Sequence, residues 1–261
     1  MRVISLSVDG IFQAAKRGLY DWIADQDADI ICLQDIRARE YELDDDVFHP
    51  QGYFAYFFDS GIKNYNGVAI YTRFQPKALI YGLGFASGVD VEGRYLQIDY
   101  DNYSIGTLLA PSARSEAESQ EVKIQFFDDF QALLHKISRK RRHFIFCGNW
   151  QMAHTSKDVQ NPEKNAQQSG FLGHEQLWMR QLFTQLDYTD AFRLAITEGG
   201  EYSWWPEGEM GKGDGWRTDY QVISKALAKK VEYASMYKTK TFSSHLPVIV
   251  DYDIDDLESI F

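Results

Sequence analysis

Two amide side chains follow a short apolar segment at a point where hydrolytic chemistry would need an acid. Residues 144–147 predict a buried strand, and Gly148 ends it at a tight turn that carries Asn149 and Gln151. In metal-assisted cleavage of phosphodiesters, a strand end of this kind carries a carboxylate that activates water. An amide accepts and donates hydrogen bonds, but it cannot take a proton near neutral pH. Whether this strand end is a working site or the remnant of one therefore decides the function.

Acidic residues follow two other predicted strands. Residues 2–8 alternate small polar and apolar side chains and end at Asp9. Residues 12–26 then show helical spacing of apolar side chains, and residues 28–33 form a second, nearly continuous apolar run that ends at Asp35. The N-terminal part therefore predicts a strand-helix-strand unit with an acid at the end of each strand.

The elements that must position these side chains form one α/β domain over residues 1–261. Short aromatic and β-branched runs between residues 53 and 109, separated by glycines, predict a mostly antiparallel block of strands. Residues 115–138 predict a helix, and residues 174–186 predict another. The pattern favours a four-layer sandwich in which two mixed sheets pack face to face and the helices lie outside.

Composition excludes several classes of protein. With 44% hydrophobic and 15% aromatic residues in 261 positions, the chain can build a sizeable core and is not disordered. No apolar run approaches the ~20 residues that a membrane helix needs, and an acid comes too early for a signal-peptide core, so we expect a cytoplasmic protein without membrane contact. Cys32 and Cys147 lie in apolar runs and are interpreted as core residues, since no metal-ligand spacing accompanies them.

The charge is negative overall and basic in one place. A formal net charge of −11 disfavours unaided binding to nucleic acid over most of the surface. The exception is a basic run at the end of the predicted helix 115–138, and it consists of Lys136, Arg139, Lys140, Arg141 and Arg142. Cations suit the C-terminus of a helix, so a solvated helix end is the alternative interpretation, but such an end needs only one or two of them.

A second group of cations follows near the C-terminus of the chain. Lys229 and Lys230 lead into a predicted strand, with Lys238 and Lys240 after it. These residues form a possible second basic patch, and an ordinary solvated strand and loop remains the alternative.

The order of the motifs resembles the exonuclease III and abasic-site endonuclease family, within the endonuclease/exonuclease/phosphatase fold. The resemblance lies in five segments, residues 5–10, 31–35, 147–151, 216–220 and 243–248. No single segment is specific, but the ordered set covers nearly the whole chain. The resemblance implies the four-layer fold and a site built from the polar residues of these segments.

The family's catalytic pattern departs from this sequence at most positions. Active members carry an Asn where this chain has Ser7, a metal-binding Glu where it has Asp35, and a Tyr where it has Leu109. The family's Gly-Asp-x-Asn motif appears here with Asn149 and Gln151, and its Ser-Asp-His motif appears with Ser244 before His245. The positions that match the pattern are Asp9, Asp219 and His245.

These departures imply a weakened metal site and a missing base. A hard divalent cation prefers charged oxygen ligands, and a serine at position 244 removes one of them. A general base contributes ~10²–10⁴-fold in rate, which Asn149 cannot supply. We therefore expect no catalytic residue and no cofactor. If a metal binds at all, we expect Asp35 to hold it, and Mg²⁺ or Mn²⁺ belongs to the nuclease alternative only. Asp219 and His245 are interpreted as structural partners.

One branch of the family, that of catabolite repression control, resembles this chain in the same departures. The similarity implies a non-enzymatic translational co-repressor that acts with the RNA chaperone Hfq on A-rich messenger leaders. A chain of charge −11 suits a role in which a partner presents the RNA and the basic run touches phosphates locally. The alternative is a metal-dependent exodeoxyribonuclease, abasic-site endonuclease or related phosphoesterase with an altered site. The oligomeric state stays open.

Overall fold

A computed structural model describes residues 1–113 and 119–254 and shows two six-stranded mixed sheets. The first sheet has the order β11-β12-β1-β2-β4-β3, with β11 Val231–Met236, β12 Val248–Tyr252, β1 Arg2–Ser7, β2 Ile30–Gln34, β4 Val68–Thr72 and β3 Phe54–Phe58. The second has the order β5-β6-β7-β8-β10-β9, with β5 Ala78–Tyr81, β6 Tyr95–Asp99, β7 Tyr103–Leu109, β8 His143–Asn149, β10 Asp219–Ser224 and β9 Tyr188–Asp190.

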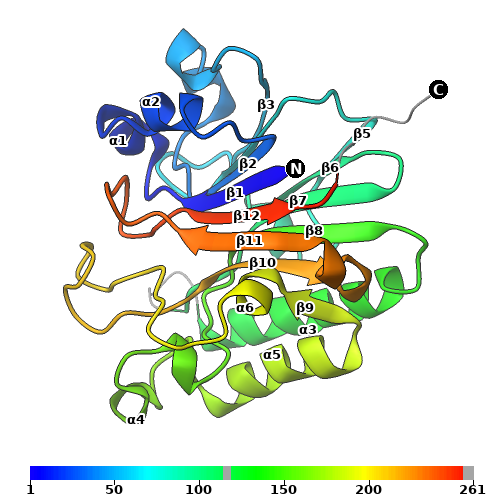
Figure 1. Ribbon diagram of the computed structural model, residues 1–261, viewed down its shortest axis with the longest axis vertical. Helices are drawn as coiled ribbons and strands as arrows, with labels where there is room; N and C mark the ends of the chain where they lie inside the picture. Colours follow the sequence, from blue (N-terminus) through cyan, green and yellow to red (C-terminus); the bar gives the residue numbers. More distant parts are fainter. Residues whose placement is uncertain (114–118, 255–261) are drawn as a thin grey trace.

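Helices cover the outer face of each sheet, which confirms the predicted four-layer arrangement. Figure 1 shows α1 (Ile11–Lys16) and α2 (Leu19–Ala24) outside the first sheet, and α3 (Gln120–Ile137) and α5 (Gly173–Gln185) along the second. The shorter helices are α4 Pro162–Asn165 and α6 Ala191–Ala195, with single 3₁₀ turns at η1 Glu40–Glu42, η2 Asp46–Phe48, η3 Val89–Val91 and η4 Ser156–Asp158 and a longer one at η5 Lys225–Lys230.

Alternation along the strands separates three apolar layers. Cys32 and Cys147 point from β2 and β8 into the layer between the two sheets, where they are fully buried. Ile31 and Leu33 point the other way, toward α1 and α2, and Phe146 points toward Phe130 of α3. Because both faces of the central strands are covered, these strands are apolar without interruption.

Parallel pairing at the centre of each sheet brings the important strand ends to one edge. β1 runs parallel to β2, with Ser7 opposite Gln34, and β7 runs parallel to β8, with Leu109 opposite Asn149. β10 is antiparallel to β8 and begins at the same edge, with Asp219 opposite Asn149. The polar residues that follow β1, β2 and β8 therefore meet at one end of the sandwich.

Element boundaries differ from the sequence prediction where glycine or burial intervenes. The predicted helix 12–26 is two helices, because Gly18 adopts a left-handed conformation with φ of 81° between them. The described part of the predicted helix 115–138 begins at Gln120; residues 114–118 lie outside the described residues. The spacing of its apolar residues places Val122 on the buried face, but Val122 is exposed, and Leu134 is buried there instead.

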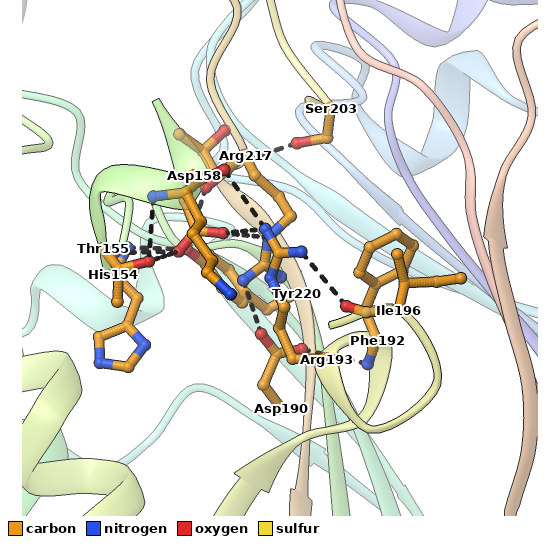
Figure 2. Close-up of polar contacts among 12 residues, drawn as sticks. His154, Thr155, Asp158, Asp190, Phe192, Arg193, Ile196, Ser203, Arg217 and Tyr220 are labelled. Atoms are coloured by element: carbon orange, nitrogen blue, oxygen red, sulfur yellow. Dashed lines mark hydrogen bonds and ion pairs between the residues drawn. The ribbon is translucent and has the colours of Figure 1, made fainter. Parts of the chain in front are cut away.

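A buried ion cluster fastens the long segment after β8 to the second sheet (Figure 2). Arg217 is fully buried, and its guanidinium donates to Asp158 Oδ1 at 2.8 Å and to Asp190 Oδ2 at 2.7 Å. It also lies 4.3 Å from the centre of the Tyr220 ring, and Arg193 contacts Asp158 from the exposed side. The cluster joins η4, β9 and β10, and so it fixes the segment that passes beside the candidate site.

Among the residues that the structure describes, no helix has both the length and the apolar character needed to cross a membrane.

Candidate functional site

A cleft of about 370 Å³ opens where the strand ends meet. Six of the residues singled out from the sequence line it, namely Asp9, Asp35, Leu109, Asn149, Gln151 and His245. Ser7, Asp219 and Ser244 lie directly behind them, as their contacts below show. The structure thus gathers all nine positions of the family pattern in one place.

Asp9 is held by the serine that stands in the family's Ser-Asp-His motif. Its Oδ2 accepts hydrogen bonds from the Ser244 backbone N–H at 2.8 Å and the Ser244 hydroxyl at 2.5 Å. Burial raises the pKa of Asp9, but the charge of His245 and these two hydrogen bonds outweigh it, so the pKa lies below its ordinary value. Asp9 is therefore an ionised carboxylate with one oxygen already occupied.

Asp35 is paired with an arginine two residues later in the chain. The Arg37 guanidinium donates from Nε to Oδ1 at 3.1 Å and from Nη2 to Oδ2 at 2.6 Å. The same Nη2 lies 3.7 Å from Asp9 Oδ1, and Nη1 donates to the Asp9 carbonyl at 3.3 Å. Burial raises the pKa of the Asp35 carboxyl, and the Arg37 charge opposes that rise. One cation therefore bridges the two acids that follow β1 and β2.

His245 and Asp219 form a buried pair at the back of the cleft. His245 Nδ1 lies 2.8 Å from Asp219 Oδ2, which also accepts from the Ser203 hydroxyl at 2.5 Å. Burial lowers the pKa of His245, but the Asp219 carboxylate, helped by Asp9 and Asp35, raises it above its ordinary value overall. The pair orients the imidazole toward the cleft, and it satisfies Asp219 Oδ2, while the buried Oδ1 of Asp219 has no hydrogen-bond partner among the described residues.

The Asn149 side chain and the Gln151 backbone stabilise the turn at the end of β8. Asn149 Oδ1 accepts from the Gln151 backbone N–H at 3.1 Å, and buried Lys123 of α3 donates to the Gln151 carbonyl at 2.8 Å. Asn149 is 2% exposed, so only a small part of its surface is open to the cleft that it lines. Ser7 is buried, and its carbonyl accepts from the Ser243 hydroxyl. None of these groups can act as a general base.

Backbone conformations that are uncommon for residues other than glycine cluster around the cleft. Asp9, Asp35, Arg37 and Gln151 have φ between 51° and 56°. Such conformations persist only where the surroundings enforce them, and they concentrate at sites that hold side chains in fixed directions. The cleft is therefore a tightly specified part of the fold.

The residues present do not fit a resident divalent cation. Among the described residues, no group of three or more His, Cys, Asp or Glu side chains is arranged to hold a metal. Both oxygens of Asp35 accept from Arg37, and one oxygen of Asp9 accepts two hydrogen bonds from Ser244. A hard cation would have to displace these donors to find its oxygen ligands.

The basic run divides into an exposed part and a structural part. Four cations are exposed in the last turn of α3 and just after it, and we refer to them as the exposed basic cluster: Lys136, Arg139, Lys140 and Arg141. Arg142 is only half-exposed, because its guanidinium donates to the carbonyls of Tyr100, Asp101 and Tyr103. Arg142 therefore stabilises the β6–β7 turn. The sequence placed it in the basic run with its neighbours and did not predict this structural role.

The sequence predicted that the second basic patch leads into a strand. In the structure its first two lysines belong to a 3₁₀ helix instead. Lys229 and Lys230 end the 3₁₀ helix η5 and are exposed, and Lys230 lies 2.8 Å from Asp253. Lys238 pairs with Glu201 at 2.6 Å. Two of these cations thus have acidic neighbours, which weakens the case for a phosphate-binding surface here.

Sequence reasoning missed several residues that shape the cleft. Arg37, Arg94 and Trp204 line it, together with the segment Asn64, Tyr65 and Asn66. Arg37 could have been singled out from the sequence, since an arginine two residues after Asp35 at a strand end can fold its side chain back to pair with that carboxylate. Arg94 lies at the start of a buried strand, and its 1% exposure could not be inferred from the local sequence.

The two mixed sheets with helices outside, and a cleft at the edge where their strand ends meet, define a four-layer α/β sandwich. A sequence profile of the Endonuclease/Exonuclease/phosphatase family matches residues 8–237, and the chain belongs to that family. It is 30% identical over 255 residues to an exodeoxyribonuclease of Bacillus subtilis, covering 95% of this chain and 98% of that protein. It is also 30% identical over 261 residues to a DNA-(apurinic or apyrimidinic site) endonuclease of Dictyostelium discoideum. That match covers 98% of this chain and 71% of the relative.

Solved structures agree with this fold. An AP endonuclease from Archaeoglobus fulgidus superposes with a TM-score of 0.86 at 21% identity, covering 97% of this chain and all of that one. A 3′-5′ exonuclease from Neisseria meningitidis gives 0.84 at 21% identity, with the same coverage. At these identities the likeness concerns the fold alone.

Proposed function

We propose that this chain is a non-enzymatic translational co-repressor of the catabolite repression control (Crc) type, which acts with Hfq on A-rich messenger leaders. The observation that carries the proposal is the amide at position 149, which is buried and bonded to its own turn where hydrolysis needs a base. The pairing of Asp35 with Arg37 supports it, because this pairing leaves the cleft without a free acidic oxygen pair for a metal.

The charge distribution suits binding to RNA through a partner. At −11 the protein repels a polyanion over most of its surface, while the exposed basic cluster offers four neighbouring cations at one end of α3. Repulsion at a distance is screened over about 8 Å at physiological salt, so the cluster can touch phosphates once Hfq holds the RNA nearby. The protein alone should bind the same RNA weakly.

A gel-shift experiment with A-rich RNA tests this model. We expect no shift with the protein alone at moderate salt, a shift with Hfq alone, and a further, slower complex with both. A shift by the protein alone would contradict partner-dependent binding. Reversal of Arg139, Lys140 and Arg141 to Glu should remove the slower complex. The control is an equal change of charge at exposed Lys16, Lys212 and Lys225, which should keep it.

A metal-dependent nuclease is the second candidate. The two relatives named as an exodeoxyribonuclease and an abasic-site endonuclease favour it, as does the retained pair of His245 and Asp219. The pure protein should then cleave an abasic-site duplex with Mg²⁺ or Mn²⁺. Turnover that disappears in Asp35→Ala would establish the nuclease and exclude a purely non-catalytic role. Absence of turnover under conditions in which a nuclease standard is active supports the co-repressor.

A further inference from the structure

A guanidinium stands between the two acids that follow β1 and β2. Arg37 binds Asp35 through two parallel hydrogen bonds of 3.1 and 2.6 Å, a geometry in which both carboxylate oxygens are engaged at once. Its Nη2 is also 3.7 Å from Asp9 Oδ1, and Nη1 donates to the Asp9 carbonyl. Arginine stays protonated at every physiological pH, so this cation is permanent.

The backbone of Arg37 is fixed by its neighbours. The Arg37 N–H donates to the Asn66 carbonyl at 2.7 Å, and the preceding Ile36 N–H donates to the Gly67 carbonyl at 3.0 Å. Ile36 is fully buried, and Arg37 itself has a φ of 51°. The backbone therefore sets where the Arg37 side chain begins, and its guanidinium, on a side chain that is 44% exposed, is held in place by its bonds to Asp35 and to the Asp9 carbonyl.

The two carboxylates would otherwise attract a divalent cation. They lie together at one edge of the sheet, and magnesium or manganese is often bound through one or two carboxylates with water filling the other positions. Arg37 blocks this in two ways. It engages one lone pair on each oxygen of Asp35, and its charge repels a second cation from the space beside Asp35 and Asp9.

We propose that Arg37 is a built-in replacement for the divalent cation, which neutralises Asp35 and Asp9 and keeps metal out of the cleft. The inference deepens the proposed function, because a protein that binds RNA with a partner needs no metal here. Its test measures metal binding and not repression, so the two can fail separately. A shorter side chain or a neutral one at position 37 should expose a metal site that the native chain conceals.

Electron paramagnetic resonance of Mn²⁺ provides the test, since the signal of the free ion falls when the ion binds. We expect no binding by the native protein at millimolar Mn²⁺, and binding at least about tenfold tighter by Arg37→Met, which keeps length and removes charge. The double variant Arg37→Met with Asp35→Asn should lose the acquired binding. Arg39→Met is the matched control, because Arg39 contacts Tyr41 and not the two acids, and it should behave as the native protein.

Each alternative outcome has a definite meaning. Native binding of Mn²⁺ that is lost in Asp35→Asn would overturn the proposal, because the guanidinium then fails to exclude metal. Lack of binding by both the native protein and Arg37→Met would also overturn it, because another feature would then account for the exclusion. Thermal unfolding of every variant verifies folding, and Arg37→Gln serves as a second neutral variant if Arg37→Met does not fold.

Discussion

Replacement of Arg217 by Met should strongly destabilise the protein. The guanidinium is fully buried and compensates Asp158 and Asp190 at 2.8 and 2.7 Å. Removing one partner of such a buried ionic group costs about 3–5 kcal/mol, because the remaining charges are left uncompensated. Asp158 is still paired with Arg193 in the variant, so Asp190 is the carboxylate that is left uncompensated. We therefore expect a loss of unfolding free energy at the lower end of this range, about 3 kcal/mol. In a chain of this size that lowers Tm by roughly 6–12 °C.

The loss of unfolding free energy in Arg217→Met should become smaller as the pH falls. Burial raises the pKa of Asp158, but Arg217 and Arg193 outweigh it, and the pKa lies well below its ordinary value. A carboxylate whose pKa is lower in the folded state than in the unfolded state stabilises the fold at pH values above the unfolded pKa of about 3.9. This stabilisation is lost as the pH falls below that value toward the folded pKa. In Arg217→Met the uncompensated carboxylates take up protons more readily. The difference in unfolding free energy between native and variant should therefore be smaller at pH 4 than at pH 7.

Urea denaturation at both pH values measures this difference. Arg193→Met is the comparison variant: its contact with Asp158 is mostly buried, but Asp158 keeps Arg217 and Asp190 keeps its own partner, so we expect a smaller loss of stability than in Arg217→Met. The double variant Arg217→Met with Asp190→Asn should recover at least about 1 kcal/mol by removing the stranded charge. A Tm of Arg217→Met within about 2 °C of the native value would refute the reasoning, as would a penalty that grows toward pH 4.

Three further predictions concern the strand end and the basic cluster. Asn149→Asp alone should restore no nuclease turnover, because Arg37 still holds Asp35; measurable cleavage with Mg²⁺ by that single variant would show that the base was the only missing part. Gly148→Ala should cost at least about 2 kcal/mol in urea denaturation, since its Cβ would collide with the Leu108 carbonyl at a φ of +155°; an unchanged midpoint would contradict this. Neutralisation of Arg139, Lys140 and Arg141 to Gln should weaken the complex with Hfq and RNA and lower the slope of its salt dependence by about two, and a slope equal to that of native protein would argue against phosphate contacts.

The layers of the fold were predictable because they follow from periodicity. Continuous apolar runs such as residues 28–33 can only be strands covered on both faces, and two such strands with a helix between them predict parallel pairing. The helix over residues 12–26 was predicted as one element because its spacing is regular. Gly18 divides it into two helices because it adopts a left-handed conformation. A single glycine within a helical pattern is not enough to predict this break.

The positions of the cleft were also predictable, but their bonding was not. Asp9, Asp35 and His245 were singled out by their places after strands or within the final motif, and the sheet topology brings them together. The sequence could not show that Arg37 turns back onto Asp35, because this depends on a backbone conformation fixed by Asn66 and Gly67. Nor could it separate Arg142 from its neighbours, since only the position of the β6–β7 carbonyls does so.

The central position of β12 has a consequence for synthesis on the ribosome. β12 lies between β11 and β1, so the first strand to be made gains its antiparallel partner only when Val248–Tyr252 has been translated. At about 5–20 residues per second, β1 waits roughly 12–50 s with one edge unpaired. That edge must be protected for the whole interval, because an unpaired strand edge can pair with another chain, and the centre of the first sheet is completed only when β12 docks.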